Sequence, residues 1–152
     1  MQAVRLEEEL KQRKPFKDER SKLVVNTIYT GLWFNGMLLD VLKKFNINDQ
    51  HYNILRILRG RYPEPALTME IKEVLVNKRG DLTRQLEKLV KLGLIEREIN
   101  AACKTQIFSY ITQKGLDTLD EIHKIHDYSE SYHTITEEEA KIVNNILDKL
   151  RG

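Results

Sequence analysis

The region from Leu67 to Gly115 constrains this chain most, because two helical patterns, a tight turn between them and two short β-like runs follow one another there. We expect the hydroxyl of Thr68 to cap the first helix, which should end near Asn77. Residues 78–80 then form the turn, because Gly80 adopts positive φ without steric cost.

A second helix is predicted over residues 81–92, with Asp81 as its N-cap and Gly93 as its left-handed stop. Leucines repeat at helical spacing on one face, which indicates burial. The opposite face is polar and basic, and it carries Thr83, Arg84, Gln85, Lys88 and Lys91. Guanidinium and amide groups match base edges in the DNA major groove, and ammonium groups match phosphates.

The β-like runs, Leu94–Ile99 and Gln106–Ile111, are rich in Ile, Phe and Tyr and flank a polar tip at Asn100–Thr105. This pattern predicts a β-hairpin. A basic helix alone is usually only a solvated helix face. A helical pair followed at once by a hairpin is much rarer, so the sequence predicts a winged helix-turn-helix with helix 81–92 as reading helix and the wing at 94–111.

Apolar segments lie on both sides of this module. The stripe in Ser21–Phe45 is too wide for a helix packed on one side only, and a further helix is predicted from Asn48 to Gly60. Thr112 should cap a long helix reaching toward Tyr132, with Gly115 a weakness early in it.

The last helix should begin with a capping box of Thr136 and Glu139. A symmetric dimer is the simplest way to bury these apolar faces, and its two reading helices could then enter major grooves one turn, roughly 34 Å, apart. The predicted fold is mainly α with a small β-hairpin wing. Three regions follow: N-terminal dimerisation helices at 1–48, the DNA-binding lobe at 49–111 and C-terminal dimerisation helices at 112–152.

Composition sets further bounds. The formal net charge of +2 is too small to indicate nucleic acid, although Leu67–Gly115 holds nine Lys or Arg against six Asp or Glu. Cys103 is the only cysteine, which favours a reducing cytosol. No segment resembles a signal peptide or a membrane span, so we expect a soluble cytoplasmic protein without a membrane partner.

No arrangement of residues typical of catalysis or nucleotide binding is visible, so neither an enzyme nor a cofactor is expected. Four residues have a spacing that could hold a metal on one helix face: Asp120, His123, His126 and Asp127. We favour a polar stripe and predict no metal site, because no cysteine or second cluster accompanies them. Cys103 beside Lys104 could sense oxidants through a lowered pKa, although a lone loop cysteine is more often incidental.

Aromatic residues suggest a ligand cavity between the N-terminal arm and the lobe. The candidates are Tyr29, Trp33 and Tyr52, with Phe34 nearby. Aromatic residues on such helices more often belong to the core, so both interpretations stay open.

Several segments together resemble the MarR (multiple antibiotic resistance) family of transcriptional regulators. They are QHYNILRILRG at Gln50–Gly60, DLTRQLEKLVKLGLIERE at Asp81–Glu98, ITQKGL at Ile111–Leu116 and the closing EEEAKIVNNILDKLRG. The resemblance implies a homodimer that reads palindromic double-stranded DNA, with helix 81–92 in the major groove and the hairpin tip in the minor groove. It also implies a repressor released by a small aromatic or phenolic ligand.

Thr83 and Arg84 match the family's Thr-Arg pair, whereas the wing departs from the family pattern. Cys103, Lys104 and Thr105 stand where relatives carry an Asp-x-Arg run, and Ser109 replaces a usual buried Val. This departure leaves an alternative: a winged-helix module with lost operator specificity that senses a ligand or binds a protein through Phe108 and Tyr110. The predicted DNA-binding residues are Arg79, Asp81, Thr83, Arg84, Gln85, Lys88 and Lys104.

Overall fold

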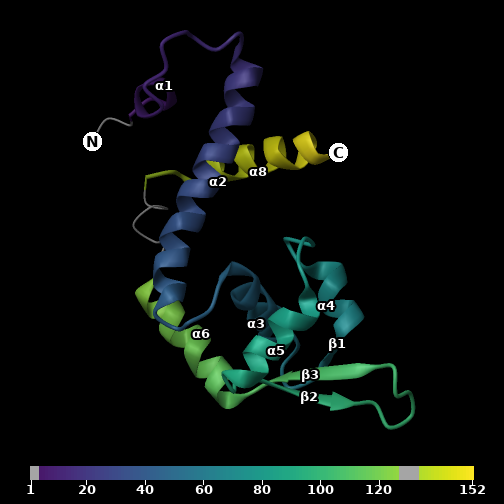
Figure 1. Cartoon of the computed structure of the whole chain (residues 1–152). Coiled ribbons are helices and arrows are strands. Elements are labelled where there is room, and N and C mark those ends of the chain that lie inside the picture. Colours follow the sequence, from purple (N-terminus) through teal and green to yellow (C-terminus); the bar gives the residue numbers. More distant parts are fainter. Residues whose placement is uncertain (1–3, 127–133) are drawn as a thin grey trace.

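The computed structural model describes residues 4–126 and 134–152 as a compact lobe attached to a long helical arm (Figure 1). In chain order the elements are α1 (Leu6–Glu9), α2 (Glu19–Lys43), α3 (Asp49–Arg61), β1 (Ala66–Leu67), α4 (Thr68–Val74), α5 (Leu82–Lys91), β2 (Ile95–Ile99), β3 (Ile107–Ile111), α6 (Gln113–Ile125) and α8 (Glu137–Arg151). The lobe comprises α3, β1, α4, α5, β2 and β3, and α2, α6 and α8 extend from it.

Helix α3 begins where the sequence predicts it to begin. The Asn48 side chain accepts a hydrogen bond from the backbone N–H of His51 at 2.9 Å, and the imidazole of His51 accepts one from the N–H of Asn48 at 3.0 Å. Each residue thus satisfies a backbone donor that the first turn would leave unpaired. The helix ends at Arg61, one residue beyond the predicted Gly60.

The prediction for α4 was wrong at both ends. Leu67 is the N-cap residue, and its N–H donates to the carboxylate of Glu70 at 2.7 Å. Thr68 therefore is not the cap, because β1 keeps the chain extended up to Leu67. The helix stops at Val74 instead of near Asn77, since Leu75 turns to an extended backbone and enters the core.

The turn and the caps of α5 are confirmed. Gly80 has a φ of +112° and Gly93 a φ of +70°. Asp81 accepts hydrogen bonds from the N–H groups of Thr83 at 3.0 Å and Arg84 at 3.3 Å. These local signals fix where α5 starts, and therefore which side chains it turns outward.

The predicted hairpin is confirmed to within one residue at each strand, but it is part of a larger sheet. The strands are antiparallel in the order β1-β3-β2. Ser109, in the central strand, is opposite Arg97 of β2 and Ala66 of β1. The strand β1 has two residues and was not predicted. Its pairing with β3 ties the start of α4 to the base of the wing.

Helix α6 begins after Thr112, whose hydroxyl accepts from the N–H of Gly115 at 3.1 Å, as predicted. It ends at Ile125, and Tyr132 lies outside the described residues. Gly115 is not the tolerated weakness that the sequence suggested. A Cβ there would collide with the Leu94 carbonyl oxygen and come within 2.7 Å of Ile111 Cγ1. This glycine is therefore required for α6 to pack on the sheet.

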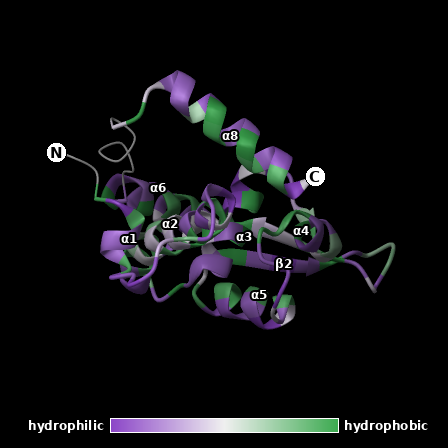
Figure 2. Ribbon diagram, turned by 90° about the horizontal axis from the view of Figure 1, so that it is seen from above, coloured by the Kyte–Doolittle hydropathy of each residue, from purple (hydrophilic) through white to green (hydrophobic). Residues whose placement is uncertain are grey.

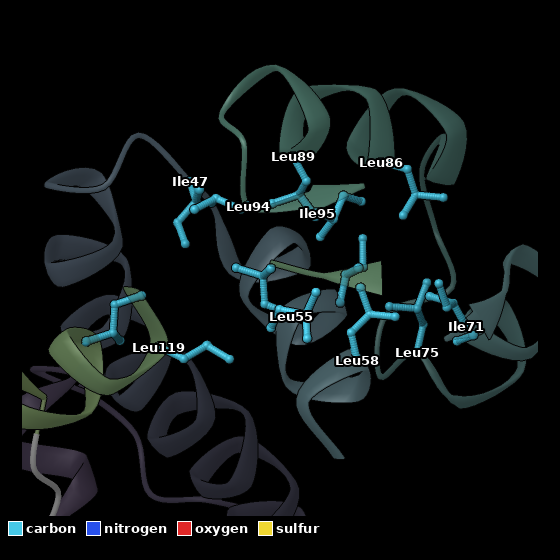
Figure 3. Close-up of a cluster of buried hydrophobic side chains, with 14 of the residues drawn as sticks. Ile47, Leu55, Leu58, Ile71, Leu75, Leu86, Leu89, Leu94, Ile95 and Leu119 are labelled. Atoms are coloured by element: carbon cyan, nitrogen blue, oxygen red, sulfur yellow. The ribbon is translucent and has the colours of Figure 1, made fainter. Parts of the chain in front are cut away.

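The core of the lobe lies between α5, α3 and the sheet (Figure 3). Leu86 and Leu89 of α5 are fully buried and point toward Leu55 of α3 and Ile95 of β2. Full burial of such a side chain contributes about 1.5 to 3 kcal/mol. The buried face of α5 is thus strongly held, and its opposite face is fixed outward.

The terminal helices expose much of their apolar surface. Figure 2 shows hydrophobic and hydrophilic residues alternating along α8. The capping box of Thr136 and Glu139 is confirmed at the start of α8. The Glu139 N–H donates to the Thr136 hydroxyl at 3.2 Å. Exposed apolar residues include Leu23, Val24, Ile28, Leu32, Trp33 and Met37 on α2 and Ile142, Val143, Ile146 and Leu150 on α8. Among the helices of residues 4–126 and 134–152, none is long and apolar enough to cross a membrane.

Candidate nucleic-acid interface

The outward face of α5 is the centre of the candidate interface. Thr83 and Arg84 are exposed there, in the first turn of α5. Glu87, Val90 and Lys91 are also exposed, and Val90, although apolar, is 41% exposed. This surface combines a guanidinium, a hydroxyl, a carboxylate and an ammonium group, which together can both donate to and accept from base edges.

Gln85 and Lys88 lie on the flank of α5, not at the centre of the outward face as expected from helical spacing. Both side chains are half-buried. Successive residues of an α-helix are about 100° apart around its axis, so Gln85 points away from Arg84 and toward α3. There its Oε1 lies 3.5 Å from Nδ2 of Asn48.

The turn before α5 carries Arg79 and Asp81. Arg79 is exposed, and its carbonyl accepts a hydrogen bond from Nε2 of Gln50 in α3. The carboxylate of Asp81 faces the backbone N–H groups of the first turn of α5. The structure therefore gives Asp81 a capping role, and DNA contact by either residue stays a prediction.

Sequence reasoning missed a layer of polar residues behind this surface, formed by Asn48, Gln50 and His51 at the first turn of α3. The pattern Asn-x-x-His was the available signal, because it places a capping side chain three residues before an imidazole acceptor. Burial lowers the pKa of His51 below its ordinary value of 6.5, and the nearby charge of Lys88 lowers it further. Asp49 acts in the opposite direction.

The wing tip presents Cys103, Lys104 and Thr105, all exposed. A hydrogen bond of 2.7 Å from Asn100 Nδ2 to Gln106 Oε1 closes the loop beneath them. The pKa of Cys103 is lowered, which the sequence offered only as the less favoured alternative, and the cause suggested there was wrong. The cause is hydrogen bonding by the side chain and backbone of Thr105, whose hydroxyl lies 3.2 Å from Sγ, and not the ammonium group of Lys104.

The strand β3 is the centre of the wing sheet. Ser109 is fully buried, and its hydroxyl has no hydrogen-bond partner among the residues that the structure describes. Phe108 and Tyr110, which the protein-binding alternative needs as outward contacts, are half-buried.

The three aromatic ligand candidates do not share one cavity. Tyr29 and Trp33 line a hollow of about 280 Å³ between α1 and α2. Tyr52 lines a separate hollow of about 560 Å³ between α3 and α6, together with Arg56, Arg59, Gly60, Leu119, His123 and His126. Only Tyr52 therefore lies where the lobe meets a terminal helix, and ligand binding by any of the three remains a prediction.

The residues weighed as metal ligands have other surroundings. Asp120 forms an ion pair with Arg59 at 3.0 Å, and His126 is buried beside the hollow of Tyr52. Asp127 lies outside the described residues. Within the part of the chain that is described, no three metal-binding side chains gather.

An exposed basic helix, a glycine turn before it and a hairpin after it define a winged helix-turn-helix fold. No protein-family model matches the chain. Among curated proteins, the HTH-type transcriptional regulator YkoM of Bacillus subtilis, described as uncharacterised, is 29% identical over 84 residues. The match covers 55% of this chain and 53% of that relative, so it spans about half the relative's length.

Solved structures extend the likeness to nearly the whole chain. A mutant MarR from E. coli, complexed with operator DNA, has a TM-score of 0.74 at 22% identity, over 90% of this chain and 99% of that one. The organohalide-sensing regulator RdhR, in its 2,4-dichlorophenol-bound form, has a TM-score of 0.77 at 20% identity, over 92% and 86%. The resemblance read from the sequence is thus confirmed: the chain has the fold of MarR-family transcriptional regulators.

Proposed function

We propose that this protein is a homodimeric, DNA-binding transcriptional regulator that represses nearby genes. The observation that carries the proposal is the exposure of Thr83 and Arg84 on a helix whose opposite face is buried in the core. In this role α5 enters the major groove of a palindromic site and the tip of the wing contacts the minor groove. The operator complex of the structurally similar E. coli MarR supports this role.

The exposed surface of α2 and α8 supports the dimer. A hollow of about 510 Å³ between these helices is lined by Leu23, Asn26, Thr27, Thr30, Gly31, Phe34, Val143, Ile146 and Leu147. Exposed apolar patches of this kind mark association sites in soluble proteins. A second copy that covers α2 and α8 buries them and places two α5 helices about a two-fold axis.

A small aromatic or phenolic ligand releases the protein from DNA. The hollow of Tyr52 lies between α3 and α6, and the Arg56 guanidinium lies 5.8 Å from the centre of the Tyr52 ring. These groups can stack on an aromatic ring and bind a phenolate oxygen. RdhR has been seen with 2,4-dichlorophenol bound. We further propose that the chain has no enzymatic activity and is cytoplasmic, and the similarity to transcriptional regulators supports both proposals.

Arg84→Ala tests the proposal directly. If Arg84 contacts a base, affinity for a duplex selected by the wild type falls by about 1 to 3 kcal/mol and preference at that base pair relaxes. Fluorescence anisotropy measures both effects. Arg20→Ala, which removes an exposed guanidinium from the far end of α2, is the matched control and keeps wild-type affinity. Equal affinity of the wild type and Arg84→Ala argues against base reading by α5.

The wing favours a second candidate function. Thr105 stands where family members carry an arginine, and the neighbouring Lys104 lacks the planar fork that suits a narrow minor groove. A module that had lost its operator would act as a protein-binding or ligand-sensing regulator. Binding to DNA at low salt without any preference in a selection from random duplexes would favour this candidate over the first.

A further inference from the structure

Polar contacts join the first turn of α3 to the reading helix. The imidazole Nδ1 of His51 accepts from the Asn48 N–H at 3.0 Å, and Asn48 Oδ1 accepts from the His51 N–H at 2.9 Å. The remaining side-chain group of Asn48, its Nδ2, lies 3.5 Å from Oε1 of Gln85 in α5. Asn48 therefore links His51 in the first turn of α3 to the flank of α5.

The same turn also supports the loop before α5. Gln50 donates through Nε2 to the carbonyl of Arg79. A Cβ built on Gly80 would lie 3.1 Å from that same Nε2, so the loop packs closely on Gln50. The first turn of α3 thus contacts the candidate DNA surface at two places, before α5 and along its flank.

This arrangement requires a neutral imidazole. Nδ1 can accept the Asn48 N–H only when it carries no proton, so the single ring proton belongs on Nε2. Nε2 is buried and has no hydrogen-bond partner within the described chain. His51 itself is only 7% exposed, and the charges that act on it are Lys88 of α5 and Asp49 of its own helix. A second proton would remove the acceptor and place a cation near Lys88.

We propose that His51 is a positioning residue that holds the DNA-reading surface through the first turn of α3, and that its protonation weakens DNA binding in mild acid. This inference rests on the proposed DNA-binding function. An imidazolium has a donor at Nδ1, so the capping pair breaks, and Asn48 and Gln50 lose the turn that aims them at Gln85 and Arg79.

The direction of the pH dependence follows from burial. The pKa of His51 is lowered in the folded protein, so protonation favours the unfolded chain, whose histidine titrates near 6.5. The stability from the capping pair is fully present above pH 6.5 and is lost as the pH falls through the lower pKa of the folded state. Neutral pH therefore favours the ordered reading surface.

Three proteins test the inference: the wild type, His51→Gln and His51→Ala. The probe is a duplex recovered by wild-type selection at pH 7.5, titrated by anisotropy at pH 7.5 and 5.5. The wild type should bind more weakly at pH 5.5 than at pH 7.5, and this loss should grow as the pH falls further, because the folded-state pKa lies below 6.5. His51→Gln should bind equally at both values, because a glutamine carbonyl can accept the same N–H and does not titrate. His51→Ala should bind more weakly than the wild type at both.

A second readout needs no DNA. Amide hydrogen exchange, expressed as protection factors, should show that residues 79–85 lose protection at pH 5.5 in the wild type but not in His51→Gln, while residues 137–151 respond alike in both. If His51→Gln showed the same pH dependence as the wild type, by either readout, the inference would be overturned. If the wild type binds no duplex at all, the proposed function fails, and the exchange measurement alone decides the role of His51.

Discussion

Ser109 is a polar residue in an apolar position. It lies in the central strand β3, fully buried, with a hydroxyl that has no partner in the described part of the chain. A buried polar group without a hydrogen bond costs about 1 to 3 kcal/mol. Ser109→Ala should therefore raise the free energy of unfolding by about 1 kcal/mol or more in urea denaturation. A lower stability of this variant would show that the hydroxyl has a partner in solution.

Gly115 shows the opposite case, in which a residue fits only because it lacks a side chain. Gly115→Ala should lower the free energy of unfolding by about 1 to 3 kcal/mol, because its Cβ meets the Leu94 carbonyl and Ile111. Gly60→Ala is the control, since a Cβ there meets nothing within 4 Å. Equal urea midpoints for the two variants would contradict the packing of α6 on the sheet.

Among the elements, α5 depends on one capping side chain. Asp81→Ala removes the acceptor for two backbone N–H groups and should lower the free energy of unfolding by about 0.5 to 2 kcal/mol. Asp81→Asn keeps an acceptor oxygen and should stay close to the wild type. If urea denaturation gives the two variants the same loss, the charge of Asp81 and not its capping bond stabilises α5.

Elements differ in how far the sequence predicts them. The start of α5 and its turn follow from Gly80 and Asp81, whose effects are local. The strand β1 could not be predicted, because two residues carry no periodicity and it exists only through pairing with β3. Because β1 keeps the chain extended through Leu67, the N-cap of α4 is Leu67 and not the predicted Thr68.

The candidate site divides in the same way. The exposure of Thr83 and Arg84 follows from the spacing of the leucines in α5, so it was predicted. The flank position of Gln85 depends on Asn48, which lies far away in the sequence and meets α5 only in the folded lobe. The requirement for Gly115 likewise comes from the approach of α6 to the sheet, which no local pattern records.

For the whole molecule, the proposed dimer makes a definite prediction. Ile146→Glu places a charge in the apolar hollow between α2 and α8, and the cost of burying it should convert a dimer into a monomer. Ile99→Glu, at the exposed end of β2, is the control and should stay dimeric. Size-exclusion chromatography with light scattering measures the mass. If the wild type had the mass of one chain, the proposed two-fold arrangement of the reading helices would be contradicted.

The central claim is that α5, presented twice by a symmetric dimer, reads DNA sequence. The most direct test is a selection from random duplexes with the wild type and with Arg84→Ala. We predict an inverted repeat with half-site centres about 10 to 10.5 base pairs apart, or a multiple of that spacing, for the wild type. Preference within each half-site should weaken for the variant. No enriched sequence, or the same repeat with equal preference for both proteins, would contradict the claim.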